Sequence, residues 1–339
     1  MKIALVNTIT PFIRGGAEIL VDDLFDQLQQ RGHRVTLFCL PFPNEYEVQL
    51  QELVLAGKLL DFTSYDRVIA FKFPAYCVCH PHKVLWLFHQ FRQVYDLWKT
   101  SEGLDIQALR QLICNIDSRD IANSQAVFVI GDEVKDRLYQ YNKINSELIY
   151  PPLPNQVDYY CAASSDYIYY PSRVTKLKRQ HLAIEAMRFV KSNAKLVLTG
   201  ECNDSGYERA LTDLIKKYNL QEKVDYKNVW LDKEEKIKKI AESMAVLFIP
   251  YKEDYGYVTL EAFYASKPLI TCTDSGSPVK FLADGKNGYI ADPTPESIAE
   301  KIDMIYENKE KTRKMGEYAY ESILRKEISW DETVRRLLQ

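Results

Sequence analysis

The chain has 339 residues, of which 46% are hydrophobic and 27% charged, and its formal net charge is −3. This composition is that of a globular protein and excludes a disordered or fibrous chain, while the length predicts two domains, each with its own core. A net charge this close to neutral argues against a generally basic nucleic-acid binder, although it leaves room for a local basic patch.

The amino-terminal residues predict a strand at the start of a cytoplasmic protein. Residues 1–7 combine one basic residue with a short apolar run and lack a small-residue cleavage site, which is not the pattern of a signal peptide. Charged residues interrupt every apolar stretch before it reaches the ~18 residues of a spanning helix. The seven cysteines are scattered and odd in number, as expected for reduced thiols.

A cluster of potential metal ligands occurs at Cys77-Val78-Cys79-His80-Pro81-His82. Zinc sites usually take paired ligands from separated segments, with two or more residues between paired cysteines, and the sequence has no second pair. We therefore predict no metal site and interpret these residues as side chains at a strand edge.

Strand and helix patterns alternate through the first part of the chain. Residues 2–8 predict a strand, residues 10–16 a loop with two glycines, and Val21, Leu24, Phe25 and Leu28 the buried stripe of a helix. A second strand is expected at 34–40, so the chain opens with a strand, helix, strand unit. The further strands are expected at 66–71, 83–88, 126–130 and 147–150, with helices at 46–60, 104–119 and 132–141. This order predicts an α/β domain with a doubly wound parallel sheet.

Three prolines within residues 150–155 mark the clearest domain boundary, because proline removes backbone donors and restricts the chain. The alternation then restarts with strands expected at 167–170, 195–199, 223–227, 245–249 and 268–272, and helices at 179–192, 206–219, 233–243 and 257–266. Three helices without strands close the chain, at 295–306, 309–324 and 329–338. We therefore predict Rossmann-like domains at 1–152 and 153–318.

Open α/β sheets bind ligands at the carboxyl ends of their strands, and two such places occur in the first domain. At Gly15-Gly16 the backbone can approach a ligand closely, and a phosphate could bind at the start of the following helix. The alternative is a plain tight turn. His89 follows the strand at 83–88, where it could serve a cleft, although a lone histidine is more often structural.

The second domain has a basic loop after its first strand. Arg173, Lys176, Lys178 and Arg179 lie within seven residues, at a strand end where cations could neutralise a leaving diphosphate. The alternative is a solvated basic loop.

Two glutamates flank another strand-to-helix junction. Glu253 would lie in the loop and Glu261 one turn into the helix, so that both could accept hydrogen bonds from sugar or ribose hydroxyls. The amides near Tyr257 and Val258, at the helix start, would add a diphosphate contact. A loop acid and an exposed helical acid are the alternative.

In order along the chain, these features resemble family four of the retaining glycosyltransferases, within the group 1 glycosyltransferases. The resemblance also includes Ala17-Glu18 and Thr199-Gly200-Glu201, and one departure, Lys280, stands where many members have a glutamate. It implies the GT-B fold, in which two Rossmann-like domains face a cleft. It further implies that residues 319–339 form a carboxy-terminal helix that crosses back to the first domain.

By position, the resemblance implies roles for particular residues. Gly15, Gly16, Tyr257 and Val258 would contact the donor diphosphate, and Arg173 with Lys178 would stabilise it as it leaves. The remaining positions are Glu253 for sugar hydroxyls, Glu261 for the ribose, Gly200 near the nucleotide and His89 beside the sugar and acceptor.

The expected activity is transfer of a sugar, with retention of anomeric configuration, to a glycan, lipid-linked or small-molecule acceptor. The resemblance implies no metal and no cofactor besides the nucleotide diphosphate sugar, with UDP-sugar or GDP-sugar favoured. Peripheral membrane contact stays open, because Trp86, Phe91, Tyr95 and Trp98 could form a lipid-facing surface or ordinary core.

Other functions on the same architecture are less well supported. The chain is short for a phosphorylase, a nucleotide-sugar epimerase would act without an acceptor, and an inactive sugar-binding module would not need Arg173, Lys178 and both glutamates. A dinucleotide oxidoreductase lacks the third glycine of its phosphate-binding motif.

Overall fold

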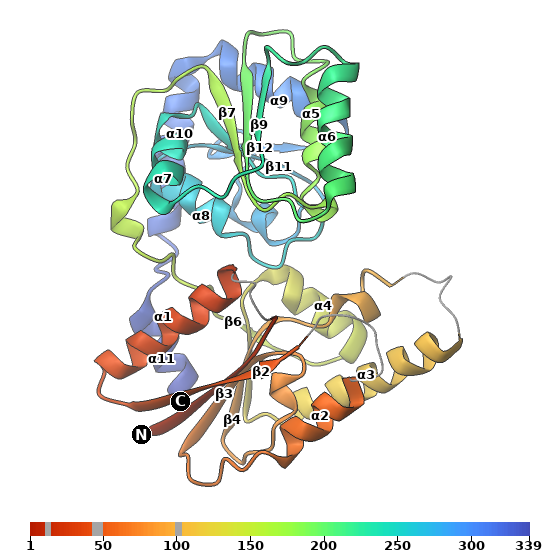
Figure 1. The fold of residues 1–339 in the computed structure, drawn as a ribbon. Helices are drawn as coiled ribbons and strands as arrows, with labels where there is room; N and C mark the ends of the chain where they lie inside the picture. Colours follow the sequence, from red (N-terminus) through yellow and green to blue (C-terminus); the bar gives the residue numbers. More distant parts are fainter. Residues whose placement is uncertain (11–14, 43–49, 99–103) are drawn as a thin grey trace. The chain divides into compact units, whose positions relative to one another are not determined.

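The computed structural model describes residues 1–10, 15–42, 50–98 and 104–339. The chain divides into two compact units (Figure 1). Unit 1 comprises Met1–Pro154 together with Ile328–Gln339, and unit 2 comprises Asn155–Glu327.

Unit 1 is built on a six-stranded parallel sheet with the strand order β2-β1-β3-β4-β5-β6. Its strands are β1 (Lys2–Ile9), β2 (Arg34–Pro41), β3 (Arg67–Lys72), β4 (Lys83–His89), β5 (Ala126–Val129) and β6 (Glu147–Leu148). Its helices are α1 (Gly16–Gln30), α2 (Leu50–Leu59), α3 (Leu104–Ala122), α4 (Asp132–Asn142) and α11 (Trp330–Leu338), with short 3-10 helices η1 (Ala75–Cys77) and η2 (Arg92–Val94). Helices α1 and α11 lie side by side on one face, and α2 and α3 cover the other (Figure 1).

Unit 2 repeats this plan with a second six-stranded parallel sheet in the order β12-β11-β10-β7-β8-β9. Its strands are β7 (Tyr167–Pro171), β8 (Lys195–Thr199), β9 (Val224–Lys227), β10 (Ala245–Leu247), β11 (Leu269–Cys272) and β12 (Gly288–Ala291). Its helices are α5 (Gln180–Ala186), α6 (Ser205–Lys217), α7 (Lys233–Glu242), α8 (Tyr257–Tyr264), α9 (Pro295–Glu307) and α10 (Lys309–Leu324), with 3-10 helices η3 (Gln156–Asp158), η4 (Lys176–Lys178) and η5 (Ser277–Phe281).

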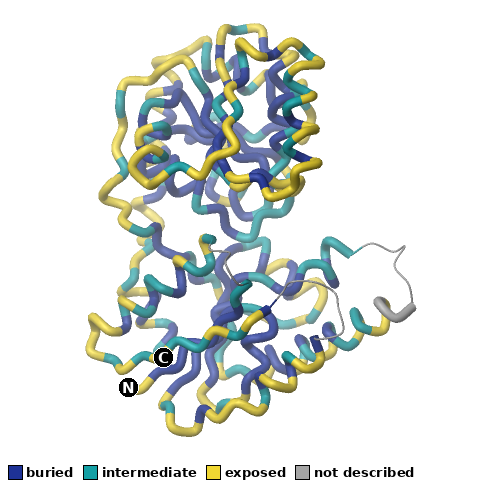
Figure 2. The backbone as a smooth tube through the Cα atoms, in the orientation of Figure 1, coloured by how far each residue is buried: buried dark blue, intermediate teal, exposed yellow. Residues whose placement is uncertain are grey.

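The strands at the centre of each sheet carry continuous apolar runs because helices cover both faces. Residues 3–6 of β1 and 84–88 of β4 are almost fully buried, as are residues 245–247 of β10. Figure 2 shows the same pattern, with buried strands inside each unit and exposed residues concentrated on the outer helices and loops.

The predicted fold class is confirmed, since both units are Rossmann-like and doubly wound. Two details differ from the sequence prediction: β12 was not predicted, and α5 ends at Ala186 although a helix to 192 was expected. Part of the predicted loop at 10–16, residues 11–14, and part of the predicted helix at 46–60, residues 46–49, lie outside the described residues.

The carboxy-terminal segment joins unit 1 by both hydrogen bonds and apolar packing. Arg336 donates to the Leu148 carbonyl oxygen at 2.6 Å, and Arg67 donates to the Leu337 carbonyl oxygen at 3.0 Å. The Leu337 side chain is fully buried. The segment enters unit 1 at Ile328 and not at 319, because α10 continues to Leu324 with its apolar side chains buried in unit 2.

A helix that spans a bilayer needs about 20 consecutive, mostly apolar residues. Within the described ranges, no helix combines enough length with enough apolar character to cross a membrane.

Candidate active site

The predicted functional residues of unit 2 follow the carboxyl ends of its central strands. Because β10, β7 and β8 are neighbours in a parallel sheet, the loops that leave them emerge at one edge. The loop after β7 carries the cations, the loop after β8 carries Gly200, and the loop after β10 carries Glu253.

Lys178 and Glu253 form an ion pair across this edge. The Lys178 ammonium lies 2.5 Å from a carboxylate oxygen of Glu253, and both side chains are partly buried. Lys178 also lies 5.0 Å from the centre of the Phe248 ring, whose π face attracts a cation. The structure therefore brings together two residues that the sequence could only place on separate loops.

The basic loop divides into residues with different surroundings. Arg179 donates to both carboxylate oxygens of Asp274 at 2.8–2.9 Å and to the carbonyl oxygens of Ile249 and Pro250, so it ties the loop to the ends of β10 and β11. Arg173 is exposed, and its guanidinium makes no hydrogen bond or ion pair with the described residues. Lys176 is exposed and lies 3.5 Å from Asp204. Arg173 and Lys178 thus remain the cations suited to a ligand, whereas Arg179 supports the backbone.

A buried glutamine fixes the loop that presents Arg173. Gln180 is 1% exposed, and its amide nitrogen donates to Ser172 Oγ at 2.9 Å and to the Arg173 carbonyl oxygen at 3.0 Å. Nothing in the sequence pattern singled out Gln180, because its partners are loop atoms.

Gly200 requires the absence of a side chain. Its φ is +156°, and a Cβ at this position would lie 1.8 Å from the Ser172 carbonyl oxygen. The loops after β7 and β8 can therefore approach each other only with glycine here, which leaves the backbone of this edge open to a ligand.

The loop after β10 leads into α8 through a left-handed glycine. Gly256 has φ +83°, and Tyr257 and Val258 form the first turn of α8. Glu261 follows one turn later and is 7% exposed. The predicted junction of a loop glutamate, a helix start and a helical glutamate is therefore present.

Glu261 is held by Lys236 of α7, a residue that no sequence pattern marked. The Lys236 ammonium lies 2.6 Å from Glu261 Oε1, whereas Oε2 is buried and receives no hydrogen bond from the described residues. The Tyr159 hydroxyl lies beside the same carboxylate, and burial together with this negative charge raises the pKa of Tyr159. A hydroxyl donor from a ligand would satisfy Oε2.

A shallow hollow of about 30 Å³ adjoins this pair. It is lined by Gly200, by Lys236 and by residues 229–231, which follow β9. Trp230 is 58% exposed there, so an aromatic surface lies next to the Glu261 site.

In unit 1, Gly15 precedes α1 and its amide is already used. Glu18 accepts a hydrogen bond from the Gly15 amide at 2.9 Å and forms an ion pair with Lys72 at 2.7 Å. Gly16 is the first residue of α1. The predicted phosphate contact at Gly15 would therefore compete with a carboxylate, while Gly16 keeps the position at the helix start that the sequence predicted.

His89 ends β4 beside a buried polar network. Its Nδ1 lies 2.9 Å from the carbonyl oxygen of Gln90, and the Gln90 amide donates to Asn142 at 2.5 Å. Asn142 donates to the Tyr95 hydroxyl at 3.3 Å, which donates to Asp117 at 2.7 Å. The network therefore connects the strand end that carries His89 to α3 and α4.

Asp117 is the buried acid of this network. It is fully buried and accepts from the hydroxyls of Tyr76 and Tyr95, both at 2.7 Å. Burial raises the pKa of Asp117 to about 7, although the two hydrogen bonds oppose that shift. No sequence signal marked Asp117.

Across the described parts of the chain, no three histidine, cysteine or acidic side chains gather in an arrangement that could hold a metal ion. In the cysteine-histidine cluster, Cys77 is buried in η1 and His80 lies 3.1 Å from the Tyr65 carbonyl oxygen.

The candidate residues that follow the carboxyl ends of the unit 2 strands all lie within a region that matches a known family. They are Arg173, Lys178, Gly200, Glu253 and Glu261. Residues 162–322 match the family model described as glycosyl transferases group 1. Residues 162–322 therefore resemble the group 1 glycosyltransferases. The resemblance to the group 1 glycosyltransferases that the sequence indicated is thereby confirmed.

Two curated relatives differ in how much of this chain they match. The alpha-1,3/1,6-mannosyltransferase ALG2 of Dictyostelium discoideum is 26% identical over 43% of this chain and 38% of its own length. The N-acetyl-alpha-D-glucosaminyl L-malate synthase of Bacillus anthracis is 23% identical over 95% of this chain and 92% of its own length.

Solved structures establish that this chain has the GT-B fold. A sucrose-phosphate synthase from Thermosynechococcus elongatus aligns with a TM-score of 0.80 at 17% identity, over 100% of this chain and 99% of that one. HepE from Anabaena, in a complex with UDP and glucose, aligns with a TM-score of 0.72 at 16% identity, over 100% and 99%.

Proposed function

We propose that the protein transfers a sugar from a nucleoside diphosphate donor to a glycan, lipid-linked or small-molecule acceptor, with retention of anomeric configuration and without a metal ion. The observation that carries the proposal is the Lys178–Glu253 ion pair at the carboxyl edge of the unit 2 sheet. A cation for a leaving diphosphate and an acceptor for sugar hydroxyls are 2.5 Å apart there.

The chemistry needs positive charge at the leaving group. As the bond from the anomeric carbon to the diphosphate oxygen breaks, negative charge grows on the diphosphate. The acceptor hydroxyl oxygen bonds to the anomeric carbon, and its proton passes to the leaving diphosphate. In the proposal, Lys178 and the exposed Arg173 neutralise this charge, and the start of α8 at Tyr257 and Val258 adds a diphosphate contact. These groups would do the work that a divalent ion does elsewhere.

The nucleoside is proposed to lie beside α8 and the loop after β8. Glu261 Oε2 is buried without a hydrogen-bond partner in the described residues, which suits a ribose hydroxyl. Gly200 lets the base approach the backbone, and Trp230 offers an aromatic surface. A UDP-sugar or GDP-sugar is the proposed donor, and the HepE complexes with UDP and UDP-glucose support this class.

Residues of unit 1 have proposed roles that follow from the resemblance. Gly16 would contact the diphosphate at the start of α1, with Gly15 joining it if Glu18 releases the amide. His89 would lie beside the sugar and acceptor, at the end of β4.

The first test compares two neighbouring lysines of η4. Lys178→Gln is expected to lower hydrolysis or transfer from UDP-glucose or GDP-mannose by a factor of about 10² to 10³, as for loss of one charge-stabilising donor. Lys176→Gln is the matched control and should leave the rate within about twofold, since Lys176 is exposed at the other end of η4. Equal rates for both variants, with unchanged melting temperatures, would contradict the assignment.

The second test concerns the nucleoside. UDP or GDP at ~100 times its dissociation constant should stabilise the protein by about 2.7 kcal/mol. Glu261→Gln should weaken that nucleotide's binding about tenfold, because a hydrogen bond to a charged acceptor contributes about 1.5–3 kcal/mol. Binding of neither nucleotide by calorimetry would refute the donor class.

Retention and metal independence have separate readouts. The anomeric configuration of the product, measured by proton NMR coupling before mutarotation, should match that of the donor. EDTA should leave the rate unchanged. A product of inverted configuration would overturn the claim of retention. A loss of activity with EDTA that Mg²⁺ or Mn²⁺ restores would overturn the claim of metal independence.

A further inference from the structure

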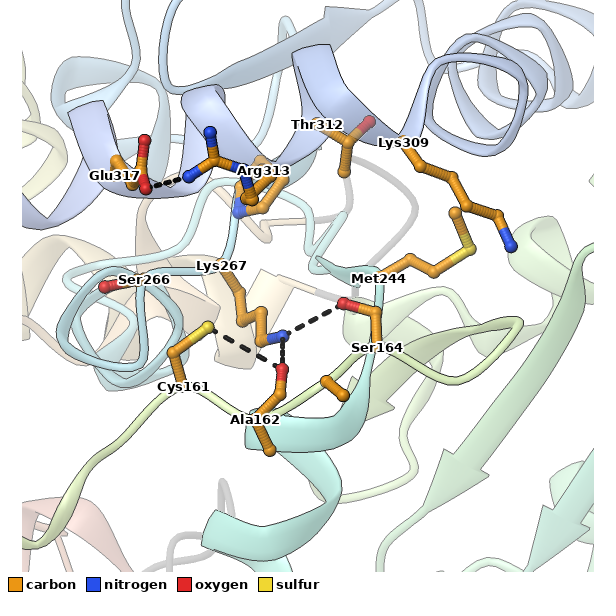
Figure 3. A pocket seen from close by; sticks show the side chains of 12 residues that line it. Cys161, Ala162, Ser164, Met244, Ser266, Lys267, Lys309, Thr312, Arg313 and Glu317 are labelled. Carbon is orange, nitrogen blue, oxygen red and sulfur yellow. Dashed lines mark hydrogen bonds and ion pairs between the residues drawn. The ribbon is translucent and has the colours of Figure 1, made fainter.

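Unit 2 contains a second pocket, of about 470 Å³, at the edge of its sheet away from the proposed donor site (Figure 3). It is lined by residues 161–164 before β7, Met244 before β10, residues 266–268 before β11, and one side of α10. These segments enter the strands at their amino ends, whereas Arg173, Glu253 and Gly200 follow the carboxyl ends. The pocket is therefore separate from the site described above.

Lys267 lines this pocket. The residue is 2% exposed, and its ammonium donates to the Ala162 carbonyl oxygen and to Ser164 Oγ, both at 3.2 Å. Both partners are neutral, and no carboxylate in the described residues forms an ion pair with Lys267. Burial lowers the pKa of Lys267, as expected for a poorly compensated cation. A buried charge of this kind is stabilised by any anion that reaches it.

The other cations of the pocket are already compensated. Lys309 lies 2.8 Å from Asp166, and Arg313 pairs with Glu310 at 2.9 Å and with Glu317. Figure 3 shows the Arg313–Glu317 pair on α10 and the Lys267 nitrogen beside Ala162 and Ser164. The uncompensated positive charge of the pocket therefore belongs to Lys267.

The remaining walls are largely apolar. Met244, Pro268 and Ala163 line the pocket together with the carbon stems of its lysines. Small-molecule sites commonly combine such walls with a few polar groups that fix the ligand's orientation.

We propose that this pocket binds a small organic anion, with its carboxylate or phosphate group at Lys267 and its apolar part against Met244 and Pro268. The Cys161 side chain is exposed and lines the same pocket, with Sγ 3.7 Å from the Ala162 carbonyl oxygen. The alkylation rate of the Cys161 thiol should therefore depend on which molecules enter the pocket.

The experiment compares alkylation of Cys161 by iodoacetate, which is anionic, and by iodoacetamide, which is neutral and similar in size. Peptide mass spectrometry of the intact chain gives both rates at Cys161 and, as an internal control, at the exposed Cys79 of unit 1. The iodoacetate-to-iodoacetamide ratio should be about tenfold higher at Cys161 than at Cys79, the effect of one unit charge a few ångströms away in a partly solvated site.

Two further arms test the cause. Lys267→Met should bring the ratio at Cys161 down to that at Cys79, and Lys267→Arg should keep it high. In the unaltered protein, butyrate and butyl phosphate at constant ionic strength should slow labelling of Cys161 in a saturable way, and whichever protects at lower concentration identifies the anionic group. Protection does not depend on how the Lys267 variants fold.

Equal ratios at Cys161 and Cys79 in the unaltered chain would overturn the proposal. So would a high ratio that survives in a folded Lys267→Met variant, or the absence of saturable protection by either anion. None of these outcomes bears on the proposed sugar transfer, which is measured at the opposite edge of the sheet.

Discussion

Replacing the buried Asp117 by asparagine should change how the stability of unit 1 depends on pH. The pKa of Asp117 rises from an ordinary 3.8 to about 7 because the carboxyl is fully buried, and the nearby Asp120 adds to the shift. The folded unit therefore favours the protonated acid. The stability that this preference contributes is fully present below pH 3.8 and is lost as the pH rises through 7.

The size of the effect follows from the two pKa values. They differ by about 3 units, and each unit corresponds to 1.36 kcal/mol, so ionising Asp117 costs unit 1 about 4 kcal/mol between pH 4 and 8. The asparagine side chain cannot ionise, and its amide can still exchange hydrogen bonds with the hydroxyls of Tyr76 and Tyr95. The free energy of unfolding of Asp117→Asn minus that of the parent should therefore rise by about 4 kcal/mol across this range.

Tryptophan fluorescence during urea unfolding can report unit 1 alone. Trp86, Trp98 and Trp330 belong to unit 1, so a Trp230→Phe background removes the fourth tryptophan, which is in unit 2. Asp136→Asn, at an exposed position of α4, is the matched control. If the free energies of unfolding of Asp117→Asn and the parent differ by the same amount at every pH from 4 to 8, the buried carboxyl does not titrate as argued.

Two further substitutions test the packing behind the site. Gly200→Ala should destabilise unit 2 by about 3 kcal/mol, because its Cβ would lie 1.8 Å from the Ser172 carbonyl oxygen. Gly285→Ala should cost only about 1 kcal/mol, because its Cβ meets no atom within 4 Å. Both losses are measured by urea unfolding followed at Trp230. Leu337→Ala should destabilise unit 1 by about 2–4 kcal/mol, and the same change at the partly exposed Leu338 by much less. Similar losses within either pair would contradict the contacts described.

The sequence predicted most of the fold because buried parallel strands leave long apolar runs. It missed β12, which has only four residues and begins at Gly288, where a Cβ would lie 2.1 Å from the Leu269 carbonyl oxygen. The sequence also extended α5 too far. In the structure Asp303 accepts the amides of Lys191 and Ser192, a contact between distant residues that no local pattern reveals.

The sequence could predict those candidate-site residues that directly follow a strand, because the end of the strand fixes where the following loop lies. Lys178, Glu253 and Glu261 could be named in this way because they follow strands β7 and β10. Lys236 could not, since it belongs to an exposed-looking run of lysines in α7 and only the tertiary contact with Glu261 distinguishes it.

The adjacent residues Lys178 and Arg179 show why charge alone does not identify function. The Arg179 side chain makes four hydrogen bonds to the ends of β10 and β11, and such a bidentate, multiply bonded guanidinium is expensive to release. Lys178 has one ion pair, with Glu253, and a flexible stem. An incoming diphosphate can therefore compete for Lys178 while Arg179 stays in place and holds η4 at the strand ends. In the proposed reaction this exchange would free the Glu253 carboxylate for sugar hydroxyls at the same moment that Lys178 meets the diphosphate.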